Sequence, residues 1–461
     1  MSEKKAAIDE WLAAAADTKY LAVRDGLIPE IPRILEQHFP GRPVFTVADE
    51  NTFAAAGQAV LEALGAGGIS TAGNFIFGGK EIHAEYRHVE TLKAEIEKAG
   101  KPVPVVTGSG TLNDLVKRTS SELDLPYLCV PTAASVDGYT AYGAALVDNG
   151  FKQTFSCPAP LAVAADSSVL AAAPSYLSSS GFGDLAGKLT AGSDWIIADR
   201  AFSLDGKGGL VPGSQKIDDT AWAMVQLPLK DNLRHSLDAV KGDRNAVKIL
   251  FEALGITGLA MQHMKNSRPV SGCEHMWSHV WEMQNLRAGG RTVTHGHKVA
   301  SGLLAAAAFT ECLFREKPSR SAPRQSWPER ESQIRRMWGG LENALPSILK
   351  TSREKFIEPG SKSAVQIEEG LLDLWDDIKA AVFEQLPPYA EIYRMLEKAG
   401  CPVKPAETGL SKARIIAAAE NAQTIRVRFT VLDLAFETGA FDSVLERMEA
   451  SDRYFTDPHR G

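Results

Sequence analysis

The sequence is poor in cysteine, with five residues in 461 and no CxxC pair. This spacing excludes a disulfide framework, and we expect free thiols in a reducing cytoplasm. Long hydrophobic runs are also absent. The longest, residues 299–310, is too short to span a bilayer. The alanine-rich N-terminus carries acidic residues, so we expect neither a signal peptide nor a transit peptide there.

Basic residues are not in excess over acidic ones either. The chain has 50 Lys and Arg against 57 Asp and Glu, for a formal net charge of −7. This balance argues against nucleic acid or an anionic membrane as the main partner. A length of 461 residues exceeds one ordinary hydrophobic core, so we expect two domains.

The pattern of apolar residues changes near residue 170. Before it, short apolar runs alternate with segments of helical length, which favours a parallel α/β sheet. After residue 179, helical periodicity dominates. We therefore predict an α/β domain over residues 1–175 and an all-helical domain over residues 176–461. Predicted strands lie at residues 20–23, 43–49, 104–107 and 127–130. Predicted helices of the second half lie at residues 183–203, 218–228, 231–255, 273–286, 295–315, 328–348, 364–384, 387–398, 410–420 and 427–448.

A glycine-rich turn, Gly108-Ser109-Gly110, follows the third predicted strand and precedes a predicted helix. Glycines let the backbone approach a phosphate, and a helix N-terminus offers N–H groups to it. The turn is not a GxGxxG sequence, and a purely structural turn is the alternative. Asp49 ends the preceding buried strand, after which Asn51 is a predicted helix N-cap. An acid at the position of Asp49 commonly binds ribose hydroxyls, and a turn or capping role is the alternative.

Two histidines stand four residues apart in the run Ser267–His279. His275 and His279 would share one face of a predicted helix. Two further histidines follow in the segment 294–297, and the segment 181–184 places an aspartate in a predicted glycine-rich turn. One carboxylate and two imidazoles on three segments are a plausible metal site. Taken singly, such residues are more often helix caps or hydrogen-bonded histidines.

Six motifs, in family order over residues 20–310, resemble the sn-glycerol-1-phosphate dehydrogenases. This superfamily also holds glycerol dehydrogenase, the iron-containing alcohol dehydrogenases and dehydroquinate synthase. The run 267–275 is most similar to the glycerol-1-phosphate branch. Two departures are His297, where the family usually has Glu, and Val136, where it has His. The motifs span residues 47–52, 108–114, 131–138, 181–184, 267–275 and 294–296.

The resemblance implies a dehydroquinate synthase-like fold with an N-terminal dinucleotide-binding domain and a helical metal- and substrate-binding domain. It implies a divalent metal (Zn, Ni or Fe) on Asp184, His275 and His295, with His297 as the rival to His295. Asp137 would face the substrate, and His279 would line the pocket and relay a proton. For these residues, turn, packing and supporting roles stay open. The implied cofactor contacts are Asp49, Gly108, Ser109, Gly110, Asp114, Thr132 and Ser135.

We predict from this resemblance an enzyme of phospholipid metabolism that interconverts dihydroxyacetone phosphate and sn-glycerol 1-phosphate. Arg268 is predicted to bind the substrate phosphate, with a surface salt bridge as the alternative. The carboxylate of Asp49 would repel the 2′-phosphate of NADP, so we expect a preference for NAD while NADP stays possible. Alternatives are glycerol or another polyol as substrate, a cyclase, or a catalytically silent binding homologue. We expect a cytoplasmic homo-oligomer, a dimer, without membrane insertion.

Overall fold

The computed structural model describes residues 2–79, 82–148, 151–204, 209–319 and 325–455. The chain forms two units, one built from residues 1–185 and 223–267 and the other from residues 186–222 and 268–461. The predicted domains, 1–175 and 176–461, differ from these units in two segments. Residues 176–185 and 223–267 belong with the sheet rather than with the helical unit.

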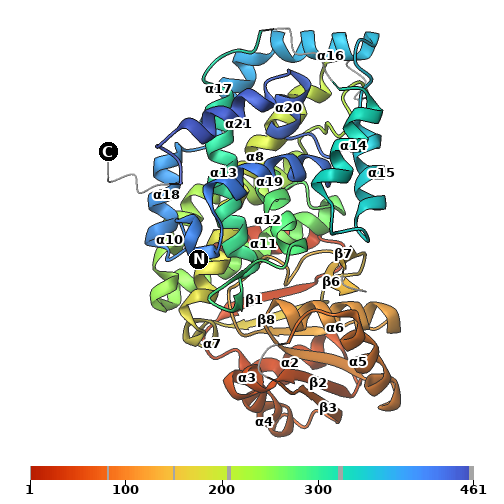
Figure 1. The fold of residues 1–461 in the computed structure, drawn as a ribbon. Helices are drawn as coiled ribbons and strands as arrows, with labels where there is room; N and C mark the ends of the chain where they lie inside the picture. The colour runs from red at the N-terminus through yellow and green to blue at the C-terminus, as the bar shows by residue number, and fades with distance from the viewer. Residues whose placement is uncertain (1, 80–81, 149–150, 205–208, 320–324, 456–461) are drawn as a thin grey trace. The chain divides into compact units, whose positions relative to one another are not determined.

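A six-stranded parallel sheet forms the centre of the first unit (Figure 1). Its strand order is β3-β2-β4-β5-β8-β1. Its strands β4, β5 and β8 are buried along their whole length, and β2 is buried in all but its last residue, as in other parallel sheets covered on both faces. The strands are β1 (Tyr20–Arg24), β2 (Val44–Asp49), β3 (Thr71–Phe77), β4 (Val103–Gly108), β5 (Leu128–Pro131) and β8 (Ala162–Asp166). The parallel α/β prediction is therefore confirmed.

Two strands of this sheet were not predicted. β3 is an edge strand with little burial, and Thr, Gly and Asn leave only its last three residues, 75–77, continuously apolar. β8 is rich in alanine, which favours helices in isolation. The first unit also holds a two-stranded antiparallel ribbon, β6 (Ala144–Asp148) and β7 (Phe151–Phe155), which was likewise missed.

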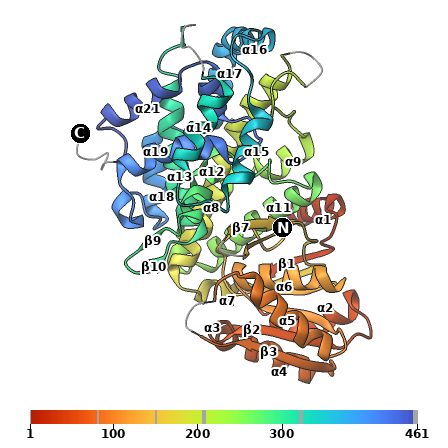
Figure 2. The ribbon, with the colours of Figure 1, turned by 45° about the vertical axis from the view of Figure 1, so that its right-hand side comes forward.

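Helices cover both faces of the sheet. On one face, α2 (Ile31–His38) and α4 (Gln58–Ala66) bury Ile31 and Val60 in a core with Val103 of β4. Helices α5 (Tyr86–Lys98) and α6 (Gly110–Leu123) lie side by side in Figure 2, and α6 packs on β4 and β2. Other elements of this unit are α1 (Ser2–Ala14), η1 (Ile28–Glu30), α3 (Glu50–Thr52), a π-helical turn (Phe53–Gly57) and α7 (Ser167–Ala172).

Helix α11 (Arg244–Met264) belongs to the unit of the sheet because two of its glycines allow a close approach. The Thr140 hydroxyl donates to the carbonyl of Gly255 at 2.6 Å. A Cβ atom on Gly258 would lie 2.0 Å from that hydroxyl. The single helix predicted over 231–255 is wrong: Gly242, with φ +75°, ends a 3-10 turn (Leu237–Lys241) between α10 (Leu229–Ser236) and α11.

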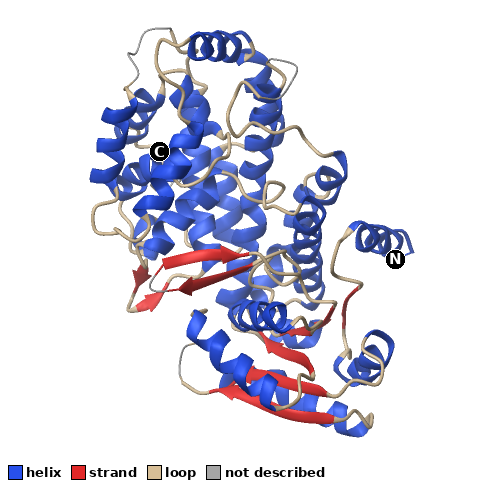
Figure 3. Ribbon diagram, turned by 90° about the vertical axis from the view of Figure 1, so that its right-hand side faces the viewer, coloured by secondary structure: helices blue, strands red, loops and turns tan. Residues whose placement is uncertain are grey.

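The second unit is built almost entirely from helices, drawn in blue in Figure 3. It holds most of α8 (Ser175–Phe202), part of α9 (Asp219–Val225) and the helices of the C-terminal half, with a short ribbon of β9 (Arg287–Ala288) and β10 (Arg291–Thr292). The later helices are α12 (Cys273–Met283), α13 (His295–Leu313), α14 (Trp327–Met337), α15 (Leu345–Lys355), α16 (Lys362–Asp373), α17 (Trp375–Gln385), α18 (Tyr389–Lys398), η4 (Pro405–Thr408), α19 (Lys412–Thr424), α20 (Val431–Glu437) and α21 (Phe441–Ala450).

Three of the long helices predicted here are each broken into two. The segment 328–348 turns at Gly340 with φ +91°, and the segment 427–448 turns at Gly439 with φ +68°. The segment 364–384 breaks at Leu374, between α16 and α17. Within the described residues, no helix is both long and apolar enough to cross a membrane.

Helices α12 and α13 pack against each other at the centre of the second unit. A Cβ atom on Gly302 of α13 would lie only 2.3 Å from the carbonyl oxygen of Glu274 on α12. Trp277 and Trp281 of α12 are fully buried in the core of this unit. The close contact fixes the first turn of α12, which carries His275.

Candidate metal centre and cofactor site

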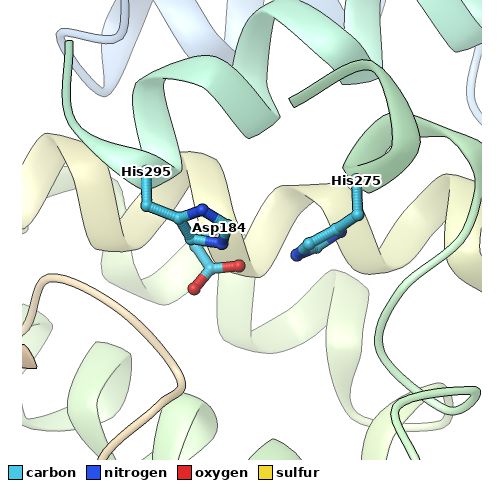
Figure 4. A group of neighbouring side chains, drawn as sticks. All are labelled: Asp184, His275 and His295. Atoms are coloured by element: carbon cyan, nitrogen blue, oxygen red, sulfur yellow. The ribbon is translucent and has the colours of Figure 1, made fainter. Parts of the chain in front are cut away.

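Asp184, His275 and His295 come together from α8, α12 and α13 (Figure 4). One ligand atom from each residue lies within 4.8 Å of the other two. Asp184 and His275 are buried, while His295 is partly exposed. Three residues far apart in the sequence thus converge, as the motifs predicted.

The glycine-rich turn predicted at residues 181–184 is wrong, because these residues lie inside α8. Gly181 is needed for a close approach: a Cβ atom there would lie 1.9 Å from the carbonyl oxygen of Ala134. The backbone N–H of Asp137 donates to Oδ2 of Asp184 at 2.9 Å. The predicted substrate residue Asp137 is therefore held beside the aspartate of the cluster.

Glu274 fixes the orientation of His275. Its Oε1 lies 2.6 Å from Nδ1 of His275 and accepts from the N–H of Gly272 at 2.7 Å, and its Oε2 accepts from the Thr190 hydroxyl at 2.8 Å. Burial raises the pKa of Glu274, but the hydrogen bond from His275 and these other donors outweigh burial and lower it. A charged acceptor at Nδ1 places the proton on that nitrogen, which leaves the Nε2 lone pair of His275 to bind a cation.

Glu282 fixes the orientation of His295 in the same way. Its Oε1 lies 2.8 Å from Nδ1 of His295, and its Oε2 lies 3.1 Å from Nδ1 of His279. Lys298 stands 3.4 Å from the same carboxylate. The sequence reasoning missed both glutamates. The signal for Glu282 was its spacing, since it falls three residues after His279 and seven after His275, on one face of α12.

The residues present fit a divalent cation. One carboxylate and two imidazoles form a mixed oxygen and nitrogen set that suits Zn²⁺, Ni²⁺ or Fe²⁺. Each imidazole also has a carboxylate on its other nitrogen, which is the usual arrangement around a metal-binding histidine. His297 is not one of the three clustered residues. Its N–H donates to the capping Thr294 hydroxyl at 3.3 Å, and burial lowers its pKa to about 4.

A second group of possible ligands, Asp194, Cys273 and Glu274, is buried throughout. The two carboxylate oxygens of Asp194 accept from the N–H groups of Cys273 at 2.6 Å and Val431 at 2.7 Å. This carboxylate therefore caps the first turns of α12 and α20. Its role is explained by the fold.

Arg268, predicted to bind phosphate, is 1% exposed. Its NH2 group donates to the carbonyl oxygens of Asp194 at 2.7 Å and Phe429 at 3.0 Å. Burial lowers its pKa to about 10. These contacts tie two backbone segments together and do not favour the phosphate role.

In the first unit, Asp49 and Gly108 end neighbouring strands at the same level. Val47 of β2 pairs with Val106 of β4, so the two carboxyl ends are aligned. After β2 the chain forms β3 at one edge of the sheet, and after β4 it adds β5 and β8 toward the other edge. The strand order therefore reverses between β2 and β4. Ligands of open α/β sheets bind at such a point.

Oδ1 of Asp49 accepts from the N–H of Thr52 at 2.7 Å, so Asp49, not the predicted Asn51, is the helix N-cap.

The turn Gly108-Ser109-Gly110 leads directly into α6. Ser109 is its N-cap but makes no side-chain capping bond, so it does not occupy the first N–H groups of the helix. A Cβ atom on Gly108 would lie 2.5 Å from Leu112, and one on Gly110 would lie 2.9 Å from Val136. The turn is thus an open helix N-terminus of the kind that binds phosphate groups.

The remaining predicted cofactor residues surround this turn or support it. The N–H of Thr132 donates to the carbonyl of Gly108 at 3.1 Å, and the Ser135 hydroxyl lies 3.4 Å from that of Tyr139. Asp114 accepts from the N–H of Ala145 at 3.2 Å and lies 3.4 Å from Lys117. Thr132 and Ser135 therefore lie in the loop after β5, whereas Asp114 anchors the ribbon β6–β7.

Comparison with known proteins defines the class first. Residues 22–174 match the family model described as iron-containing alcohol dehydrogenase. The structure resembles a probable glycerol dehydrogenase from Sinorhizobium meliloti, with TM-score 0.60, 17% identity and coverage of 95% of this chain and 99% of that one. A 1,3-propanediol oxidoreductase gives TM-score 0.60 at 16% identity over 93% of this chain and 99% of that one. The fold is thus that of the iron-containing alcohol dehydrogenases, as the resemblance implied.

Proteins with a similar sequence show which family within this class the chain belongs to. The glycerol-1-phosphate dehydrogenase [NAD(P)+] of Halalkalibacterium halodurans is 30% identical over 391 residues, 84% of this chain and 85% of that protein. The enzyme of the same name from Bacillus velezensis is 36% identical over 272 residues, 59% of this chain and 66% of that protein. The chain belongs to the glycerol-1-phosphate dehydrogenase family, and the predicted family is confirmed.

Proposed function

We propose that this protein catalyses the reversible, NAD(P)-dependent reduction of dihydroxyacetone phosphate to sn-glycerol 1-phosphate. The observation that carries the proposal is the convergence of Asp184, His275 and His295 in a chain whose relatives are named for this activity. The two glutamates behind the histidines support it, because they orient the rings toward a common point.

Asp184, His275 and His295 would hold a divalent metal, and the donor set suits Zn²⁺, Ni²⁺ or Fe²⁺ equally. Such an ion supplies a Lewis acid that polarises a carbonyl oxygen. The nicotinamide cofactor supplies the hydride. Asp49 would bind its ribose, and the turn 108–110 its pyrophosphate.

Two further residues would act on the substrate side. The N–H of Asp137 is bound to Asp184, which orients the loop that carries Asp137. His279 lies between Glu282 and Arg426, with Nε2 3.2 Å from the arginine. Burial, together with Arg426, lowers the pKa of His279 to about 3 against the opposing effect of Glu282. Because Nδ1 of His279 faces Glu282 and Nε2 faces Arg426, we assign this histidine a positioning role in place of the proton relay that the sequence suggested.

The test is to follow nicotinamide absorbance with dihydroxyacetone phosphate before and after treatment with a chelator. We expect turnover that is lost on chelation and restored by Zn²⁺, Ni²⁺ or Fe²⁺; the ion that restores most activity identifies the preferred metal. Dihydroxyacetone should be a much poorer substrate than its phosphate. A preference for the unphosphorylated compound or for glycerol would identify a polyol dehydrogenase. No turnover with any of these compounds would identify a binding homologue.

The predicted compartment and oligomeric state belong to the same proposal. All five cysteines are buried thiols without disulfide bonds, which suits the reducing cytoplasm predicted from the sequence. The predicted homodimer is tested by light scattering on the purified protein.

A further inference from the structure

Arg426 lies on the short connection between α19 and α20, residues 425–430. Its NH2 group is 3.2 Å from Nε2 of His279. The side chain is partly exposed, in contrast to Arg268, which is 1% exposed. An arginine in this position can meet a ligand without first leaving the protein core.

The contact fixes the state of His279. A guanidinium group only donates hydrogen bonds, so Nε2 of His279 must accept, and Nδ1 must carry the proton. That proton is donated to Oε2 of Glu282 at 3.1 Å, the carboxylate that also holds His295. A series of hydrogen bonds, from Arg426 through His279 to Glu282, therefore connects the arginine to the candidate metal cluster.

The distances suit a small phosphorylated substrate. The ring of His279 is centred 6.2 Å from the ring of His275 and 6.3 Å from the ring of His295. Arg426 stands on the other nitrogen of His279. A three-carbon compound with its carbonyl at the cluster would therefore carry a phosphate at one end toward Arg426.

The segment that carries Arg426 is held firmly by the rest of the second unit. The N–H of Phe429 donates to the carbonyl of Gly213 at 2.8 Å, and the carbonyl of Phe429 accepts from Arg268 at 3.0 Å. The next residue but one, Val431, donates its N–H to Asp194. Buried Arg268 thus positions the segment, which explains its contacts without a direct role in binding.

Positive charge is concentrated here. Arg428 follows Arg426 by two residues and donates to the carbonyl of Ser271. Burial first, and then repulsion by Arg268 and Arg426, lower the pKa of Arg428 well below its usual range. Arginines held close enough to repel one another are stabilised by a bound dianion, whose oxygens match their fork of donors.

We propose that Arg426 binds the phosphate group of the substrate, with Arg428 beside it, and that Arg268 acts only by positioning their segment. This inference rests on the proposed function, because it assigns a phosphate to the substrate. It replaces Arg268, the phosphate-binding residue predicted from the sequence, with two arginines about 160 residues further along the chain.

The experiment compares kcat/KM for dihydroxyacetone phosphate with that for dihydroxyacetone, using the metal-loaded enzyme. Loss of a charged hydrogen bond predicts that Arg426→Ala lowers the ratio of the two values by roughly 10- to 150-fold. Arg426→Lys should lie in between, because an ammonium group lacks the planar fork. Arg335→Ala, on the exposed surface of α14, is the matched control and should keep the wild-type ratio.

A second readout separates binding from folding. Inorganic phosphate should inhibit the wild type competitively, and Arg426→Gln, which retains a donor to His279, should weaken this inhibition while metal content and melting temperature stay at wild-type values. If the wild type prefers the phosphorylated substrate but Arg426→Gln keeps both this preference and the phosphate inhibition, the inference is wrong. If the wild type does not use the phosphorylated compound at all, the proposed function itself fails.

Discussion

Glu282 accepts from His295, with 2.8 Å between Oε1 of the glutamate and Nδ1 of the histidine. Its other oxygen serves His279. A glutamine at position 282 keeps the size of the side chain but offers only one acceptor oxygen for two donors. We expect Glu282→Gln to weaken metal affinity about 10- to 100-fold. Titration of the metal-free protein measures this, with Glu331→Gln, a partly exposed glutamate of α14, as the control. Equal metal affinities of Glu282→Gln and the wild type would show that Glu282 does not support the site.

The choice between the two histidines of the segment 294–297 is tested by two alanine variants. His295→Ala should lose bound metal and nearly all turnover, because His295 is one of the three clustered residues. His297→Ala should keep its metal and lose little activity. Metal analysis after gel filtration, together with steady-state rates, gives the answer. Equal losses in the two variants would show that His297 also binds the ion.

Asp49→Ser tests the cofactor preference with little disturbance of the fold. Serine is as good an N-cap as aspartate, so the capping bond to Thr52 is retained. The substitution removes the carboxylate that we propose as the ribose acceptor, together with its negative charge. We expect the ratio of kcat/KM for NADH to that for NADPH to fall at least about 10-fold. Such a fall corresponds to a change of about 1.4 kcal/mol in the discrimination between the two cofactors. A wild-type enzyme that uses both cofactors equally would leave Asp49 with a capping role alone.

Gly302→Ala tests the close contact of α12 and α13. The new methyl group would lie 2.3 Å from the carbonyl oxygen of Glu274, and neither backbone can yield without moving its helix. We expect a loss of about 3 kcal/mol or more in the free energy of unfolding. Gly65→Ala in α4, where nothing lies within 4 Å, is the control and should be neutral or stabilising. Thermal denaturation measures both, and equal melting temperatures would contradict the packing argument.

The sequence predicted the buried strands β2, β4 and β5 well, missed the alanine-rich β8, and predicted the interrupted helices poorly. β2 and β4 are continuous apolar runs bounded by turn residues, so the pattern alone identifies them. In contrast, the break at Leu374 has no glycine or proline to signal it, and helical periodicity continues through it. Edge strand β3 lacks burial and therefore lacks a pattern. What could not be predicted was decided by tertiary packing, not by local preference.

The candidate site shows the same limit. The residues Asp184, His275 and His295 could be predicted because each lies in a motif. Glu282 and Arg426 could not, since neither lies in one of the six motifs and the fold brings each into contact with a histidine. The role predicted for Arg268 rested on its motif, which lies next to the histidines in sequence; in the fold its side chain donates to the carbonyls of Asp194 and Phe429.

The carboxylate of Asp194 also has a consequence for the order of events during synthesis. It joins the start of α12 to the N–H of Val431, so the helix that carries His275 is completed by a residue close to the C-terminus. Roughly 150 residues separate the two, which a ribosome adds in roughly 10 to 30 s. During that time the histidines have left the ribosome while their supporting segment has not. A chain that stops before α20 lacks this support for α12, and we expect it to bind a divalent metal less tightly than a chain that contains α20.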